Sequence, residues 1–194
     1  MKKSLLIFGM IISTLFFGCN SGEKEKQDYS EQDVKELKNA ASEFSGELKS
    51  ALLNEVRDGG FPSAVSVCAD TAQKLTNRIA EENGVEIKRV TFKTRNKINE
   101  PDEYQKEILQ KFQSMKDAGN LSDTTAVVET VEIDGEKYLS FMKPIKTMPL
   151  CLNCHGENID EEIAESIKEK YPEDEAIGYG NDELRGAVSI RKKI

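Results

Sequence analysis

The sequence is short of three features that would each point to a particular kind of protein. It has four cysteines among 194 residues and only one close pair, so its spacing gives no disulfide framework. It has no surplus of basic side chains: 27 lysines and arginines stand against 35 acidic residues, and a net charge of −8 argues against nucleic acid as a partner. It contains one histidine, so a metal site within one chain cannot use two imidazoles. We find no internal repeat either.

A short apolar segment stands at the start of the chain. Two lysines precede the predominantly apolar residues 5–17, and Gly18 and Cys19 follow. This order predicts a signal peptide over residues 1–18 that ends in a lipobox, with Cys19 as the lipidated first residue. An uncleaved membrane anchor is the alternative, but the run is short for a span of roughly twenty apolar residues. We therefore expect an exported lipoprotein of the periplasm or cell envelope, held at a membrane by its lipid.

The chain after the predicted cleavage site divides into a tether and a folded part. Cleavage removes two lysines and no acid, which leaves 25 basic and 35 acidic side chains and a net charge of −10. Residues 19–29 are mostly polar and predict a flexible tether that holds the domain off the membrane. Residues 30–194 have the length of one ordinary domain, so we expect a single domain there. In an oxidising compartment its unpaired thiol, Cys68, needs an explanation.

Hydrophobic periodicity and turn residues predict an α+β domain. Four segments have helical start and stop signals, from Ser30 to Gly59–Gly60, Pro62 to Asn83–Gly84, Pro101 to Gly119–Asn120 and Asp160 to Pro172. Asp134–Gly135 predicts a hairpin between the middle two of four β-rich runs, which span 85–93, 126–133, 137–145 and 186–192. Pro144 and Pro149 are expected to break the second hairpin strand before Cys151. The order of elements predicts an antiparallel sheet with flanking helices and a long N-terminal helix.

The chemistry of the sequence is concentrated in one motif, Cys151-Leu152-Asn153-Cys154-His155. It matches the C-x-x-C-H pattern of c-type haem attachment. Residues three apart lie on one face of a helical turn, so both thiols can reach the two vinyl carbons at one porphyrin edge. His155 follows on the same turn, where its imidazole can bind the iron. We therefore predict one covalently attached haem c.

Three other interpretations of this motif stay open. A zinc site needs a fourth ligand, from Cys68 or a carboxylate, beside the three that the motif supplies. A redox-active C-x-x-C needs a nucleophilic thiolate at a helix start, in a thioredoxin-like setting that the expected order of elements does not resemble. A simple disulfide leaves His155 without a role. Export favours haem over all three, because c-type attachment is completed outside the cytoplasm.

The second axial ligand of such a haem is constrained by the absence of another histidine. Bis-histidine ligation within one molecule is excluded, which leaves methionine, cysteine, lysine, a small molecule or no ligand. After signal-peptide cleavage the sulfur candidates are Cys68, Met115, Met142 and Met148. Met148 lies too close to Cys151 along the chain to reach the opposite haem face, and Met142 fits the core of a strand. We favour Cys68, on the inward stripe of the second helix; the alternative is a buried cysteine that acts as a small hydrophobe.

Several stretches together resemble one known family. They are Ala64-Val65 with Cys68 and Ala72, Arg89-Val90-Thr91, Arg95-Asn96 with Asn99-Glu100-Pro101, the haem motif with Gly156, Gly178-Tyr179-Gly180, and Leu184-Arg185-Gly186-Ala187-Val188. Over residues 64–191 the chain resembles the Tll-type c-haem family of periplasmic sensor proteins, long catalogued as a domain of unknown function. The resemblance implies a PAS-like antiparallel sheet around the haem, with Cys68 as the axial ligand opposite His155. Val90-Thr91 departs from the family, which more usually has an arginine and a small polar residue there.

Three polar residues are candidates for binding the haem propionates. Arg89 and Arg95 each offer a planar two-donor fork that matches a carboxylate, and Asn96 follows directly in the chain. The alternative is that each of them is an ordinary surface side chain that only water contacts.

The expected ligand set points to a function. A histidine and a thiolate on one iron stabilise the ferric state and predict a low reduction potential. We expect a redox or small-ligand (NO or CO) sensor, in which loss of Cys68 from the iron moves its helix and alters what a protein partner binds. No output domain follows the last expected strand, so such a sensor would need a second protein. The alternative is a periplasmic electron-transfer cytochrome c; we do not expect an enzyme, because no second histidine can act as a distal acid–base group.

Overall fold

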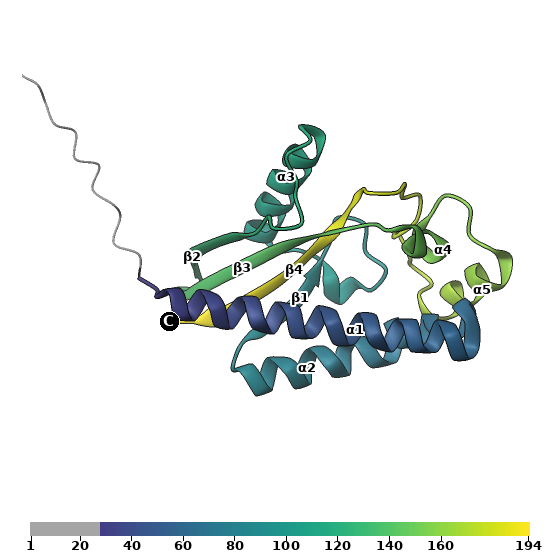
Figure 1. The fold of residues 1–194 in the computed structure, drawn as a ribbon, viewed down its shortest axis with the longest axis horizontal. Coiled ribbons are helices and arrows are strands. Elements are labelled where there is room, and N and C mark those ends of the chain that lie inside the picture. The colour runs from purple at the N-terminus through teal and green to yellow at the C-terminus, as the bar shows by residue number, and fades with distance from the viewer. Residues whose placement is uncertain (1–27) are drawn as a thin grey trace, which may run out of the picture.

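The computed structural model describes residues 28–194; the predicted signal peptide, Cys19 and nearly all of the predicted tether lie outside the described residues. The helices in this range are α1 (Glu31–Ser66), α2 (Ala72–Asn83), α3 (Glu103–Asp117), α4 (Leu152–His155) and α5 (Glu161–Lys170) (Figure 1). The strands are β1 (Glu86–Val90), β2 (Val127–Ile133), β3 (Glu136–Lys146) and β4 (Leu184–Lys193). They form one antiparallel sheet in the order β1-β4-β3-β2. The predicted α+β class, with an antiparallel sheet, flanking helices and a long N-terminal helix, is confirmed.

Helix α1 begins where the sequence predicts, and the glycines that were expected to end it interrupt it instead. The Ser30 hydroxyl accepts a hydrogen bond from the Asp33 backbone N–H, and the Asp33 carboxylate accepts one from the Ser30 backbone N–H, which closes a capping box. Gly60 has a φ of 77°, a left-handed value that interrupts the helical conformation two residues before Pro62. The predicted second helix therefore begins within the range of α1, after this bend.

A single π-helical turn, Val67–Thr71, joins α1 to α2 and contains Cys68. Such turns are rare and occur frequently at functional sites. The predicted second helix thus consists of the end of α1, this wider turn and α2. Helical periodicity in the sequence does not predict the wider turn, because the apolar stripe continues through it.

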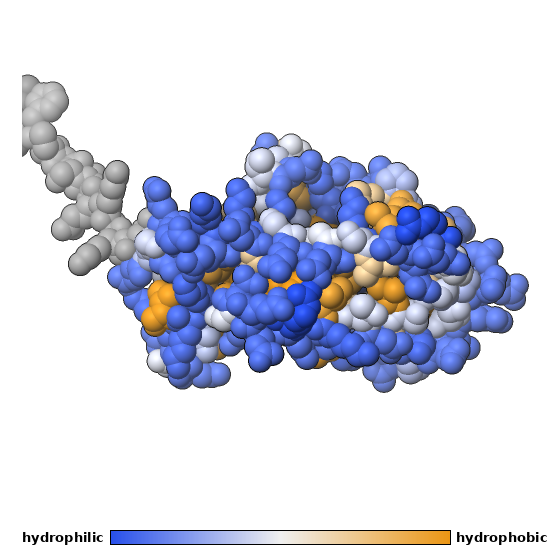
Figure 2. Space-filling model, turned by 60° about the horizontal axis from the view of Figure 1, so that its bottom comes forward, coloured by the Kyte–Doolittle hydropathy of each residue, from blue (hydrophilic) through white to orange (hydrophobic). Residues whose placement is uncertain are grey.

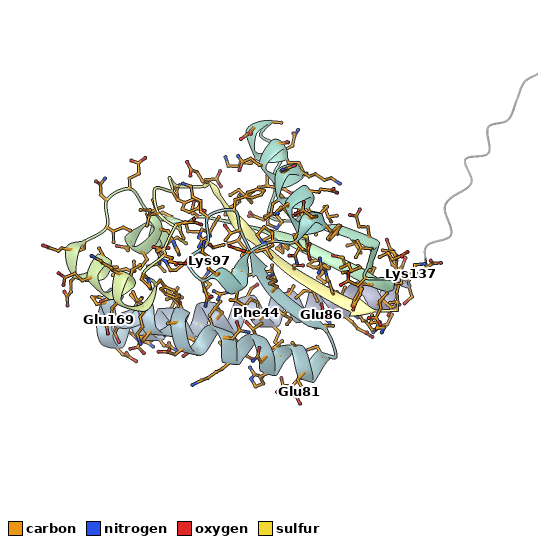
Figure 3. The ribbon with its side chains drawn as sticks, turned by 180° about the vertical axis from the view of Figure 1, so that it is seen from behind. Phe44, Glu81, Glu86, Lys97, Lys137 and Glu169 are labelled. Atoms are coloured by element: carbon orange, nitrogen blue, oxygen red, sulfur yellow. The ribbon has the colours of Figure 1, made fainter. Side chains whose placement is uncertain are left out.

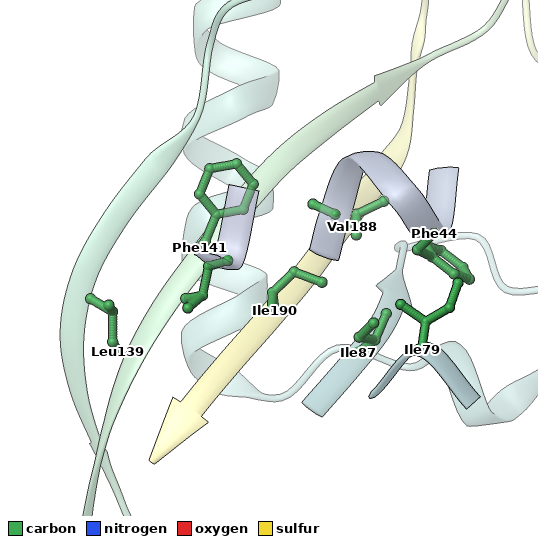
Figure 4. Close-up of a cluster of buried hydrophobic side chains, with 9 residues drawn as sticks. Phe44, Ile79, Ile87, Leu139, Phe141, Val188 and Ile190 are labelled. Atoms are coloured by element: carbon green, nitrogen blue, oxygen red, sulfur yellow. The ribbon is translucent and has the colours of Figure 1, made fainter. Parts of the chain in front are cut away.

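Helices cover both faces of the sheet. On one face, Phe44 of α1 and Ile79 of α2 pack in a cluster with Val188 and Ile190 of β4 (Figure 4). Helix α3 packs on the other face, in a cluster that comprises Val90, Ile108, Leu109, Phe112, Leu121, Val127, Met142 and Ala187. Because side chains alternate across a strand, β4 contributes neighbouring residues to both clusters. The sheet is therefore the middle of three layers.

The C-terminus and the C-x-x-C-H motif lie at opposite ends of the molecule. Helix α1 runs from the end where the C-terminus lies to the end where α4 and α5 lie (Figure 1). There α5 packs against α1 in a third apolar cluster of Val65, Ile163, Ile167 and Tyr171. In Figure 3, Glu169 of α5 marks this end and Lys137, at the start of β3, marks the opposite one. The C-x-x-C-H motif on α4 is thus far from the C-terminus.

The hairpin prediction is confirmed, but the predicted strand break at Pro144 is wrong. Asp134 and Gly135 both have positive φ values, 53° and 79°, and connect β2 to β3. Strand β3 continues through Pro144 to Lys146, paired only with β4 there, because the pairing with β2 ends at Met142. A proline is tolerated where no neighbouring strand needs its missing N–H.

The surface is mainly hydrophilic, with apolar side chains in separate patches in the view of Figure 2. The exposed large apolar residues include Leu53, Phe92, Ile98, Met148, Ile177 and Ile194. Within residues 28–194, no helix combines the length and the apolar character that crossing a bilayer requires.

Candidate functional site

The C-x-x-C-H motif forms a compact helical turn. A 3₁₀ turn, Pro149–Cys151, leads directly into α4, and the Cys151 N–H donates to the Met148 carbonyl over 2.8 Å. The Asn153 side chain donates to the Leu150 carbonyl over 3.0 Å, which fixes the residue between the two cysteines. Cys151, Cys154 and His155 are all half-buried. The predicted helical placement of both thiols and the imidazole is confirmed.

The imidazole of His155 is held in one tautomer. Its Nδ1 lies 2.7 Å from the Ala176 carbonyl oxygen, and since a carbonyl can only accept, Nδ1 must carry the hydrogen. Burial lowers the pKa of His155 to about 3, with further lowering from Arg185, Arg95 and Arg89 that the Ala176 hydrogen bond only partly offsets. The ring is therefore neutral at pH 7, with a lone pair on Nε2. A hydrogen bond on one nitrogen that frees the other is the usual arrangement of a metal-binding histidine.

The three described cysteines are free thiols with different surroundings. Cys154 packs at the edge of the apolar cluster between α1 and α5, and burial raises the pKa of its thiol. Cys68, in the π-helical turn, is close enough that its charge would raise the pKa of Cys154 and of Tyr171. Cys68 therefore lies in the same electrostatic neighbourhood as the motif. Among residues 28–194 no group of three or more histidine, cysteine and acidic side chains is arranged to hold a metal ion.

Two of the three methionines that were considered as ligands lie away from the motif, and the third, Met148, is exposed directly before it. Met142 is fully buried in the cluster between the sheet and α3, and Met115 packs against the same cluster. Met148 is 45% exposed, three residues before Cys151. Of the candidate sulfurs, Cys68 is thus the one that is both distant from the motif in sequence and in its electrostatic neighbourhood.

Three arginines converge on His155, and only one of them has an acidic partner. Arg95 forms a bidentate ion pair with Asp174, at 3.1 and 2.9 Å. Arg185 donates to the Thr91 hydroxyl over 2.9 Å and lies over the Tyr179 ring, and burial lowers its pKa. The side chain of Arg89, half-buried, makes no hydrogen bond or ion pair with residues 28–194. Two positive charges near the histidine are therefore not neutralised, which favours an anionic ligand.

The residues predicted to bind propionates have different surroundings. Arg89 has free donors near His155. Arg95 is almost fully buried, with 8% of its side chain exposed, and its donors already contact Asp174 and the Cys154 carbonyl. Asn96 uses its side-chain oxygen to cap a 3₁₀ turn, accepting from the Ile98 N–H over 3.1 Å. Propionate binding stays a prediction for all three, and the structure gives it the clearest geometric basis at Arg89.

Sequence reasoning about the site missed Arg185, Asp174 and Tyr179. Tyr179 lies edge-on to His155, with 6.4 Å between ring centroids. Arg185 is the extra residue at a β-bulge, because Ile145 pairs with Gly186 whereas Lys146 pairs with Leu184. Bulges often redirect a side chain next to a functional site. Two signals were available: a glycine inside a strand, here Gly186, can mark a bulge, and Tyr179 and Arg185 stood among the stretches that resemble the family, although no role at the site was assigned to them.

Comparison with known proteins gave two matches. The model of a family described as Tll0287-like matches residues 20–192. The crystal structure of the cyanobacterial haem-protein Tll0287 is similar, with a TM-score of 0.62 and 23% identity over 85% of this chain and 97% of that chain. At this identity the likeness concerns the fold. No curated protein matches the chain.

Proposed function

Because the chain belongs to the Tll0287-like family, we propose that it is an exported haem-binding protein that carries one c-type haem on Cys151 and Cys154. The observation that carries the proposal is the state of the single histidine. His155 is neutral, donates through Nδ1 to the Ala176 carbonyl and keeps the Nε2 lone pair for a metal. Two free thiols at the required spacing lie on the same helical turn.

The residues of the site fit such a group. Cys151 and Cys154 would form the thioether links, and His155 would bind the iron through Nε2. The unneutralised charges of Arg89 and Arg185 suit the two propionates of a haem. When bound, a c-type haem supplies an iron centre that exchanges one electron and can accept small ligands.

We propose Cys68 as the second axial ligand and as the moving part of a redox or small-ligand sensor. The thiol lies in a π-helical turn between two longer helices, and α1 reaches from this turn to the opposite end of the molecule. A π-helical turn holds an extra residue, so release of Cys68 can be accommodated locally while α1 and α2 stay folded. Packing of α1 against the sheet and α5 then offers a route by which a second protein could detect the change.

The decisive experiment compares the exported full chain with two sulfur variants, Cys68→Ala and Met148→Ala. We expect the mass of all three to be that of the polypeptide plus one haem, because the attachment motif is intact. The absorption and EPR spectra should change only in Cys68→Ala, and its reduction potential should rise, because a thiolate stabilises the ferric state. Met148→Ala is the control, since it removes an exposed sulfur close to the motif.

The outcomes separate the parts of the proposal. A mass without haem in the matured wild type would refute the haem assignment itself. Spectra that are identical in wild type and Cys68→Ala would remove Cys68 from the ligand set. Reduced wild type that keeps its thiolate and takes up neither NO nor CO, while exchanging electrons rapidly with a periplasmic donor, would replace the sensor with an electron carrier.

A further inference from the structure

The loop between α5 and β4 lies alongside the C-x-x-C-H turn. We call residues 174–179 the bracing segment. The Gly178 N–H donates to the Gly156 carbonyl over 3.0 Å, and the Tyr179 N–H donates to the His155 carbonyl over 2.9 Å. With the bond between His155 Nδ1 and the Ala176 carbonyl, three hydrogen bonds join the bracing segment to the histidine and its successor. The position of the imidazole therefore depends on the position of the bracing segment.

The guanidinium of Arg95 connects the bracing segment to the motif. It forms the bidentate pair with Asp174 and also donates to the Cys154 carbonyl and, at 3.4 Å, to the Ala176 carbonyl. The Asp174 carboxylate in turn accepts from the Ala176 N–H over 2.9 Å. Ala176 is the residue whose carbonyl receives the histidine hydrogen. The ion pair thus contacts Ala176 directly and, through the Cys154 carbonyl, the residue before His155.

The ion pair between Arg95 and Asp174 is almost fully buried, and removing two charges from water costs free energy. The Arg95 and Asp174 side chains are 8% and 9% exposed. Buried pairs of this kind contribute little net stability compared with apolar residues, but they fix geometry strongly. Arg95 and Cys154 are 59 residues apart in sequence. The hydrogen bond between them therefore joins two segments that local interactions would not bring together.

We propose that Arg95 and Asp174 are positioning residues that hold the Ala176 carbonyl on Nδ1 of His155, so that Nε2 alone is presented to a metal. The inference concerns hydrogen-bond geometry in the chain itself; only the use of Nε2 for haem iron rests on the proposed function. It assigns Arg95 a role different from propionate binding, which the geometry favours for Arg89 and Arg185.

Charge and geometry can be separated by one substitution. Arg95→Lys keeps the positive charge near His155, but a single ammonium cannot contact Asp174 at two oxygens and the Cys154 carbonyl as a planar fork does. The matched control is Arg185→Lys. Arg185 also influences His155 electrostatically, but it donates its hydrogen bonds to Thr91 and Lys93, and it contacts the bracing segment through the face of the Tyr179 ring, a cation–π contact that a lysine can also make.

The single histidine makes a direct readout available. ¹⁵N NMR of the full chain, prepared without haem at pH 7, reports the tautomer of one imidazole with no overlap. We expect wild type and Arg185→Lys to be almost entirely Nδ1–H. In Arg95→Lys the share of the Nε2–H tautomer should rise about tenfold, which corresponds to weakening one hydrogen bond by roughly 1.4 kcal/mol.

A second variant and a separate check for haem attachment complete the experiment. Asp174→Asn removes the ion pair while keeping a similar shape, and it should move the tautomer in the same direction. Unchanged Nδ1–H signals in both folded variants would overturn the proposal, and failure of both to fold would assign the pair to stability instead. A chain that never acquires haem but shows the expected tautomer change would refute the proposed function and leave this inference intact.

Discussion

Gly186 lies where β4 comes close to β1, next to the bulge that redirects Arg185. A Cβ at this position would meet the Val90 carbonyl oxygen at 2.3 Å and the Thr91 Cβ at 3.0 Å. Its φ of 154° is a value that side-chain-bearing residues rarely adopt. The glycine therefore allows the close strand contact beside which Arg185 turns toward Tyr179 and His155.

We expect Gly186→Ala to lower the free energy of unfolding by roughly 1–3 kcal/mol, because the backbone of β1 must move away from the new methyl group. Urea denaturation measures this change. Gly46→Ala is the control, since nothing lies within 4 Å of a Cβ there and the helix should gain up to about 1 kcal/mol. Equal stability of Gly186→Ala and wild type would contradict the close approach.

At the scale of elements, the first turn of α1 is tied to the end of β4 by Lys192. Its ammonium contacts the Asp33 carboxylate at 3.0 Å and the Glu36 carboxylate at 2.7 Å. The Ser30 cap and Lys192 hold the pKa of Asp33 below its ordinary value, and Lys192 and Gln32 do the same for Glu36. The long helix is thus fastened to the sheet at the end opposite the site.

This tie predicts a pH dependence of stability. A carboxylate whose pKa is lowered in the folded state stabilises the fold above its ordinary pKa and loses that effect as the pH falls through the folded value. Lys192→Met should therefore be less stable than wild type at pH 7, and the difference should shrink below about pH 4. Thermal unfolding from pH 7 to pH 2 measures it. Lys111→Met, which removes an exposed lysine with no ion pair to residues 28–194, should show a pH-independent difference from wild type.

At the scale of the whole molecule, the chain enters the described domain at the end away from the site. The stretch of α1 from Glu31 to Gly59, before the interruption at Gly60, extends for roughly 45 Å at about 1.5 Å per residue. The C-x-x-C-H turn lies at its far end, beside α5 (Figure 1). A membrane anchor would therefore be joined to the end of the domain opposite the proposed haem site.

The proposed lipid anchor can be tested separately from the site. We expect Cys19→Ser to move the exported protein from the membrane fraction to the soluble fraction, because the acyl chains on Cys19 are the proposed membrane anchor. Its visible spectrum should equal that of wild type, since the residues proposed to attach the haem and bind its iron do not include Cys19. Fractionation followed by immunoblotting and absorption measures both. A Cys19→Ser protein that stays in the membrane would contradict lipid anchoring.

Local patterns in the sequence determined the elements and the central motif. The capping box at Ser30, the break in helical conformation at Gly59–Gly60, the Asp134–Gly135 hairpin and the C-x-x-C-H turn were all predictable, because each depends on residues within a few positions of one another. The single histidine excluded bis-histidine ligation without any structure. The family resemblance added the PAS-like form of the expected sheet and strengthened the earlier preference for Cys68 as the second axial ligand.

Only the tertiary structure decided which long-range partners surround the histidine. Asp174 and Arg185 meet Arg95 and His155 through segments that are distant in the chain, and no periodicity encodes such a meeting. The continuation of β3 through Pro144 likewise depended on where β2 ends. Hydrogen bonds between residues close in sequence can be predicted from the sequence. The electrostatic surroundings of a buried group depend on residues that are distant in sequence and that only the fold places next to it.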